Sequence, residues 1–190
     1  MLLYIHVPFC RRKCRYCAFY SNPSTRSGDE MSVYLSALYA ELGQWGRRLG
    51  RVPVESVFFG GGTPSLLDPD QLAGVLDCVG RMFEVLPGAE ISMEANPDSL
   101  HTAEKASGFL AAGVNRISLG VQSLHDGMLE RLGRLHRADA AREAFRAIPK
   151  VKKPKFRWRN LPHYALIELW LAADVFRYIG YRIMRFFKIR

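Results

Sequence analysis

Short apolar runs alternate along this chain with longer segments of helical periodicity. The apolar runs have the length of buried strands, and turn or cap residues separate them from the helical segments. One helix is expected from a cap at Asp29 or Ser32 to about Leu49. The pattern predicts further helices at about 69–83, 102–112, 126–132 and 138–147, and strands at 2–7, 56–59, 90–95 and 116–120.

The strand–helix alternation occurs four times, which predicts right-handed βαβ units and a parallel sheet. The expected fold class is therefore α/β, with about four βα units. Ligands of such sheets bind at the carboxyl ends of the strands. A cysteine-rich loop follows the first run, three glycines at 60–62 follow the second, Glu94 ends the third and Gln122 lies just past the fourth. We therefore expect one site at this edge of the sheet.

Three of the four cysteines lie close together, in the pattern Cys10-x3-Cys14-x2-Cys17. Thiolates are the usual protein ligands of iron–sulfur clusters. Three thiolates can hold three irons of a cubic cluster and leave the fourth iron open to a substrate or cofactor. A zinc site with His6 as the fourth ligand and a loop of three free thiols are the alternatives. Cys78 stands alone in a predicted helix, which is typical of a small core residue.

The motifs at the predicted sheet edge resemble those of radical S-adenosylmethionine (SAM) enzymes. Within that superfamily they resemble the oxygen-independent coproporphyrinogen III oxidase-like family. The resemblance covers about 1–147, in the family's order and spacing. It rests on YIHVPFC at 4–10, FFGGGTP at 58–64, EANPD at 94–98, NRISLGVQS at 115–123 and LGR at 132–134.

The resemblance implies a partial parallel (β/α) barrel that carries a [4Fe–4S] cluster, with the open iron chelated by the amino and carboxylate groups of SAM. Reduction of such a cluster splits SAM into methionine and a 5′-deoxyadenosyl radical. Cys10, Cys14 and Cys17 match the family's cluster ligands. The positions that match its SAM-contacting or substrate-proximal residues are Tyr4, Tyr16, Gly61, Gly62, Thr63, Glu94, Gln122 and Arg134.

The residue two positions after Cys17 separates two branches of this family. True oxidases carry a further cysteine there, whereas this chain has Phe19. The Cys-x-Phe-Tyr-Ser form is similar to the HemW heme-chaperone branch, whose members bind heme and pass it to acceptor proteins. We therefore expect a HemW-like chaperone with a heme or porphyrin ligand. One alternative is an oxygen-independent coproporphyrinogen III oxidase. The other is a truncated, inactive fragment, because full-length members of the family continue with two further strands and a C-terminal domain.

Cations interleave the cysteines at Arg11, Arg12, Lys13 and Arg15. A thiolate-ligated cluster with SAM is net negative, so nearby cations favour its reduction. The same charges predict docking of an acidic electron donor such as a flavodoxin. An ordinary solvated loop is the alternative.

Charge and composition change near Pro149. Of the 27 Lys and Arg residues, 11 lie in 150–190, against 2 of the 18 acidic residues, so the net charge of +9 resides there. We expect two segments: the N-terminal part of a radical SAM core at 1–149, and a basic aromatic tail with an amphipathic helix at 150–190. A frame-shifted or fused read, a cover for the open sheet edge and weak membrane contact are the three interpretations of this tail.

The remaining sequence features favour a cytoplasmic protein. No run of eighteen apolar, uncharged residues predicts a membrane span, and the N-terminus lacks the pattern of a secretory signal. Clustered cysteines without a disulfide framework also fit a reducing compartment. No nucleic-acid-binding motif accompanies the basic tail.

Overall fold

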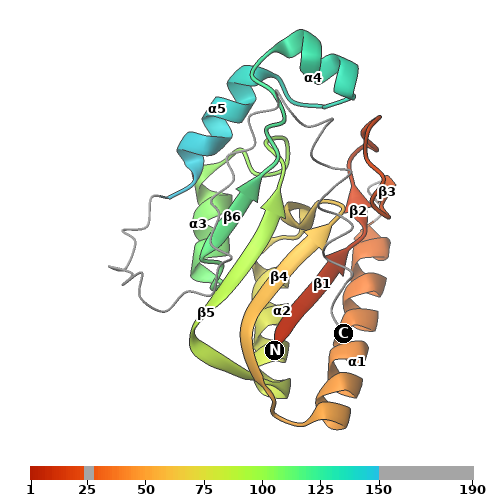
Figure 1. Ribbon diagram of the computed structural model, residues 1–190, viewed down its shortest axis with the longest axis vertical. Coiled ribbons are helices and arrows are strands. Elements are labelled where there is room, and N and C mark those ends of the chain that lie inside the picture. Colours follow the sequence, from red (N-terminus) through yellow and green to blue (C-terminus); the bar gives the residue numbers. More distant parts are fainter. Residues whose placement is uncertain (24–27, 150–190) are drawn as a thin grey trace, which may run out of the picture. The chain divides into compact units, whose positions relative to one another are not determined.

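The fold is built on a four-stranded sheet in which all neighbouring strands are parallel. We describe it from a computed structural model, in which residues 1–23 and 28–149 are described. The strand order is β1-β4-β5-β6, and Figure 1 shows these strands side by side with their carboxyl ends at one edge. The predicted α/β class is confirmed. The strands are β1 (Leu2–Val7), β4 (Pro53–Gly61), β5 (Glu84–Ala95) and β6 (Arg116–Leu119).

The helices follow the local start and stop signals closely. Asp68 and Gln71 form a capping box at the start of α2, with Pro69 at the first helical position. The Thr102 side chain accepts a hydrogen bond from the backbone N–H of Lys105 and caps α3. The predicted cap of the first helix lies too late in the chain, because α1 already begins at residue 28. The helices are α1 (Gly28–Leu49), α2 (Pro69–Met82), α3 (Ala103–Ala111), α4 (Asp126–Leu132) and α5 (Ala138–Ala147).

Two strands are longer than the sequence pattern indicates. β4 and β5 begin at Pro53 and Glu84, several residues before the apolar runs at 56–59 and 90–95, and their register shifts between Val54 and Ser56. The early part of β5 contains Pro-Gly, which by itself favours a turn. Three short elements were not predicted, because two or three residues carry no periodicity: β2 (Phe9–Cys10), β3 (Asn22–Pro23) and the 3₁₀ helix η1 (Pro64–Leu66).

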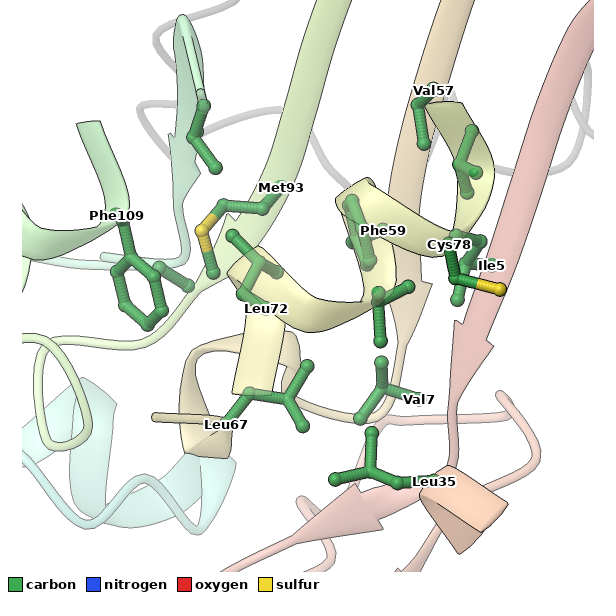
Figure 2. Close-up of a cluster of buried hydrophobic side chains, with 14 of the residues drawn as sticks. Ile5, Val7, Leu35, Val57, Phe59, Leu67, Leu72, Cys78, Met93 and Phe109 are labelled. Atoms are coloured by element: carbon green, nitrogen blue, oxygen red, sulfur yellow. The ribbon is translucent and has the colours of Figure 1, made fainter. Parts of the chain in front are cut away.

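The hydrophobic core lies between the sheet and the helices. The strand register aligns Ile5, Phe59, Met93 and Ile117 in one row across the sheet. Ile5, Phe59 and Met93 are buried, and helix residues such as Leu35, Leu72 and Phe109 pack in the same cluster (Figure 2). The predicted core role of Cys78 is confirmed, since it is 6% exposed within this cluster. Among the described residues, no helix is long and apolar enough to cross a membrane.

The glycine turn (residues 60–62), where β4 ends, fixes the position of the cysteine loop. The Gly62 backbone N–H donates to the Val7 carbonyl at 2.8 Å. A Cβ atom on Gly62 would lie 2.5 Å from the carbonyl oxygen of Phe9 and 2.9 Å from that of Val7. Gly61 has φ +108°, and a Cβ there would overlap the His6 ring. The absence of side chains at Gly61 and Gly62 therefore lets the start of the cysteine loop pack directly against this turn.

Gly62→Ala should lower the free energy of unfolding by about 1–3 kcal/mol, because the added methyl group meets backbone that cannot rotate away. The matched control is Gly80→Ala on the exposed surface of α2, where a Cβ meets nothing within 4 Å. That change should leave stability equal or raise it by up to about 1 kcal/mol. Thermal and urea unfolding measure both. Equal stability of the two variants would show that the turn does not pack against the loop in this way.

Candidate functional site

The carboxyl edge of the sheet gathers the loops that carry the predicted site residues. The cysteine loop (residues 8–22) follows β1, the glycine turn ends β4, and Asn96 follows β5. The backbone N–H of Asn22 donates to the Pro8 carbonyl at 2.7 Å and closes the neck of the cysteine loop. This edge is where parallel sheets bind ligands, as the sequence predicts.

The three clustered cysteines differ in exposure. Cys10 lies in β2 and is buried, while Cys14 and Cys17 are half-buried. The Cys17 backbone N–H donates to the Cys14 carbonyl at 3.2 Å, which makes a tight turn between these two residues. All three thiols are free, as is that of Cys78.

Two of the interleaved cations clamp the cysteine loop to neighbouring loops. The Arg11 guanidinium donates to the Asp98 carbonyl at 2.5 Å and lies 3.8 Å from the Asp98 carboxylate. The Arg15 backbone N–H donates to the Leu132 carbonyl at 3.1 Å, at the end of α4. The loop is thus joined to the segments after β5 and after β6.

The other two cations of the cysteine loop have different surroundings. The Lys13 ammonium group donates to the Phe19 carbonyl and, at 3.0 Å, to the Ser21 hydroxyl, so it braces the loop from inside. Arg12 is exposed and has no hydrogen-bond or ionic partner among the described residues. One of the four cations is therefore available to a further molecule.

Two of the thiols accept hydrogen bonds from residues on other loops. The Thr63 hydroxyl lies 3.5 Å from the Cys10 sulfur, and the Arg134 Nη1 lies 3.4 Å from the Cys14 sulfur. Arg134 also donates from Nη2 to the Asn96 side-chain oxygen at 2.6 Å. Its Nε–H is buried and has no hydrogen-bond partner among the described residues. A buried, unpaired donor is unfavourable unless another group accepts from it.

The residues present fit a thiolate-bound cluster and an anionic ligand, because two of the thiols face hydrogen-bond donors and Arg134 has a donor to spare. Within 1–23 and 28–149, no three His, Cys, Asp or Glu side chains are arranged to hold a metal ion. Donors that point at sulfur stabilise negative thiolates rather than neutral thiols. The spare Arg134 Nε–H offers a charged donor. Arg134 also lines a small cavity together with Cys14, Thr63 and Arg12.

Glu94 and the glycine turn meet on the sheet face opposite the helices. The Gly61 backbone N–H donates to the Glu94 carboxylate at 3.2 Å. Burial raises the pKa of Glu94 above its ordinary value, and the Gly61 hydrogen bond partly offsets this. Partial burial, followed by the charge of Glu94, also raises the pKa of Tyr4. Glu94 is therefore a half-buried carboxylate with one hydrogen-bond donor among the residues that the structure describes, which leaves capacity for a polar ligand.

His6 is engaged at both ring nitrogens. The Tyr4 hydroxyl lies 3.1 Å from Nδ1, and Nε2 lies 3.0 Å from the Tyr20 carbonyl oxygen. Because a carbonyl only accepts, Nε2 carries the proton and Nδ1 accepts from Tyr4. His6 therefore links the predicted SAM-contacting Tyr4 to the end of the cysteine loop. Both of its nitrogens are in use, which argues against the zinc alternative.

Two predicted residues lie at the rim of the site. Tyr16 is partly exposed; burial raises its pKa most strongly, while the charge of Arg134 opposes this. Gln122 has φ 63°, which is the one positive φ of a non-glycine residue in the described part of the chain. Its side-chain nitrogen would lie 3.3 Å from a Cβ on Gly120, beside Arg134. The site thus brings the predicted residues to one sheet edge, except that Tyr4 lies within β1 and reaches the edge through its bond to His6, and that Tyr16 and Gln122 lie at the margin.

Asn115 and Arg116, which begin the NRISLGVQS motif, contact β5 and not the site. Asn115 accepts from the Ile91 backbone N–H and donates to the Ala89 carbonyl, and Arg116 pairs with Glu90 at 3.0 Å. All three partners belong to β5, so these two residues fasten β6 to its neighbour.

Sequence reasoning missed two residues of the site. Asn96 bonds to both Thr63 and Arg134; its position directly after a predicted strand is the signal that could have identified it. His136 is buried, and its Nε2 donates to the Val121 carbonyl at 3.1 Å, next to Gln122. Burial, followed by the charge of Arg134, lowers the pKa of His136. No local pattern marks that contact.

Known proteins resemble this chain over its described part and beyond. The sequence pattern of the family described as the Radical SAM superfamily matches residues 4–162. The heme chaperone HemW of Haemophilus influenzae is 39% identical over 145 residues, which are 75% of this chain and 38% of that protein. An oxygen-independent coproporphyrinogen III oxidase of Bradyrhizobium diazoefficiens is 33% identical over 201 aligned positions, which are 98% of this chain and 44% of that protein.

A solved structure gives the same fold. Coproporphyrinogen III oxidase (HemN) from Escherichia coli, a radical SAM enzyme, superimposes with a TM-score of 0.70 at 28% identity. The match covers 77% of this chain and 33% of that one. The chain therefore spans between a third and a half of the length of these proteins.

Glu94→Gln should become more favourable for stability as the pH rises. The folded state holds the Glu94 proton more tightly than the unfolded state, so the contribution of this group is present below the ordinary glutamate pKa and is lost as pH rises through the raised pKa. Glutamine keeps an oxygen for the Gly61 N–H and never ionises. The melting temperature of the variant minus that of the parent should be larger at pH 7 than at pH 4. An equal difference at both pH values contradicts the burial of this carboxylate.

Proposed function

The chain belongs to the radical SAM superfamily, and from this premise we propose that Cys10, Cys14 and Cys17 hold a [4Fe–4S] cluster with SAM bound beside it. The observation that carries the proposal is that Thr63 and Arg134 aim donors at two of these sulfurs from other loops of the sheet edge. A loop of unrelated free thiols gives no reason for such donors. When bound, the cluster and SAM supply a radical through reductive cleavage of the sulfonium.

The residues around the cysteines divide the work of holding SAM. Arg134 offers its unpaired Nε–H to an anionic group, such as the carboxylate of an amino acid. Glu94, held by Gly61, offers a carboxylate to a cationic or hydroxyl donor. Tyr4 in β1 and Tyr16 in the cysteine loop present partly exposed rings. The side chains of Gln122 and Arg134 both lie next to Gly120, so Gln122 can contact a ligand that Arg134 binds.

The proposed role is that of a HemW-like heme chaperone. Heme chaperones HemW from several bacteria are about 40% identical to this chain over the part they share. Phe19, which stands where the oxidase branch carries its further cysteine, is 64% exposed. An oxygen-independent coproporphyrinogen III oxidase is the second candidate, because its relative aligns with 98% of this chain. Both candidates imply a heme or porphyrin ligand.

A reducing partner and the two-segment organisation belong to the same proposal. The exposed Arg12, free of partners among the described residues, suits the acidic surface of a donor such as a flavodoxin. The segment at 1–149 is proposed as the N-terminal part of the radical SAM core. The predicted tail helix and its membrane contact lie outside the described residues.

Anaerobic reconstitution with ferrous iron and sulfide should give about four irons per chain, a broad absorption near 400 nm and dithionite-dependent cleavage of SAM. Replacement of Cys10, Cys14 and Cys17 by serine should abolish all three signals. Cys78→Ala, which changes the core and not the loop, should keep them. Iron content that survives the triple replacement, or an absence of colour in the parent chain, overturns the proposal.

The chaperone and oxidase candidates differ in what they do with porphyrins. A chaperone should bind heme in a spectroscopic titration of the full chain and leave coproporphyrinogen III unchanged during SAM cleavage. Decarboxylation of coproporphyrinogen III, detected by chromatography of the products, would instead support the oxidase. A chain that binds neither heme nor porphyrin while it carries the cluster contradicts both candidates.

A further inference from the structure

A continuous set of hydrogen bonds connects Cys10 to Cys14 through three side chains of other loops. The Thr63 hydroxyl lies 3.5 Å from the Cys10 sulfur, and the Asn96 amide nitrogen donates to the Thr63 hydroxyl oxygen at 3.0 Å. The Asn96 amide oxygen accepts from Arg134 at 2.6 Å, and Arg134 reaches the Cys14 sulfur at 3.4 Å. We call Thr63, Asn96 and Arg134 the sulfur-donor network.

The chemistry of arginine fixes the direction of every bond in the sulfur-donor network. A guanidinium only donates, so the Asn96 atom that faces Arg134 is the oxygen. The Asn96 nitrogen therefore faces Thr63 and donates to it. The Thr63 hydroxyl accepts this bond, and its own proton is left to point at the Cys10 sulfur.

Asn96 itself is held firmly by its backbone. Its backbone N–H donates to the Ser65 hydroxyl at 3.2 Å, and its carbonyl accepts from the Ser99 hydroxyl at 3.1 Å. Both serines are almost fully buried and lie 2.5 Å apart, hydroxyl to hydroxyl. Thr63 is 3% exposed, so its bond to Cys10 lies in surroundings of low polarity, where a hydrogen bond is electrostatically stronger.

We propose that Asn96 is a positioning residue that directs Thr63 and Arg134 to donate to the sulfurs of Cys10 and Cys14, and so raises the reduction potential of the cluster on these cysteines. The inference rests on the proposed function. Hydrogen bonds to ligand sulfur stabilise negative charge, and the reduced cluster carries one more electron than the oxidised one. The network serves two of the three sulfurs, since no described side chain donates to Cys17.

The test is an anaerobic redox titration of the reconstituted full chain, in which electron paramagnetic resonance reports the amount of reduced cluster at each potential. Thr63→Val, which keeps the shape and removes the donor, should shift the potential to a more negative value, and Asn96→Ala should shift it in the same direction. The double variant should shift it by less than the sum of the two, because the residues act through one network. Thr63→Ser restores the hydroxyl and should restore the parent potential.

Asn115→Ala is the matched control for a merely structural effect. It removes the hydrogen bonds to Ile91 and Ala89 of β5 and no bond of the sulfur-donor network, so it should lower the melting temperature and leave the potential unchanged. Parent-like potentials in Thr63→Val and Asn96→Ala, or an equal shift in Asn115→Ala, overturn the inference. Thermal unfolding of the cluster-free chains shows whether each variant folds. If Asn96→Ala does not fold, the potential of Thr63→Val decides the test.

A measurement on the cluster-free chain separates this inference from the proposed function. The side-chain amide resonance of Asn96 should move in Thr63→Val and stay in place in Thr63→Ser, because valine removes its acceptor. An unmoved resonance overturns the network and leaves the cluster proposal standing. A moved resonance in a chain that assembles no cluster supports the geometry and overturns the proposed function, together with the redox role built on it.

Discussion

Hydrogen bonds from neighbouring loops to the cysteine loop hold the site together. The sheet alone brings the ends of its strands to one edge, but it does not determine where a loop of fifteen residues lies. Arg11, Arg15 and the close backbone contact at Gly62 fix that loop against the segments after β4, β5 and β6. Thr63 and Arg134 then reach the thiols themselves. These bonds therefore position the cysteines relative to the edge of the sheet.

Three of the four cations in the cysteine loop have a structural role. Cations between cysteines suggest an electrostatic role, either in tuning a cluster or in docking a donor protein. Arg11, Lys13 and Arg15 instead satisfy carbonyl groups within the fold, so much of their function is to shape the loop. Their charge still acts on whatever the thiols bind, because a clamped cation is also a fixed one. Of the four cations of this loop, only Arg12 is exposed and has no hydrogen-bond or ionic partner among the described residues.

Periodicity and caps were sufficient to predict the order of the main elements and most of their bounds, because each of these signals is local. Asp68, Pro69 and Thr102 mark helix starts that the structure keeps. The extra length of β4 and β5 comes from pairing between distant segments, and the sequence around Pro87 and Gly88 does not indicate it. In the site, residue types after each strand predicted which side chains gather, and the same signal marks Asn96, whereas His136 depends on a partner that no local pattern identifies. The ligand role of the predicted residues remains a prediction from resemblance.

The central claim is that three thiols of one loop hold a cubic iron–sulfur cluster and leave one iron for SAM. Mössbauer spectroscopy of the reconstituted full chain tests this most directly, because it reports each iron separately. The account predicts four irons of which one changes its signal when SAM is added, while the other three do not. Four irons that stay alike with and without SAM, or iron bound in any form other than a cluster, would contradict it.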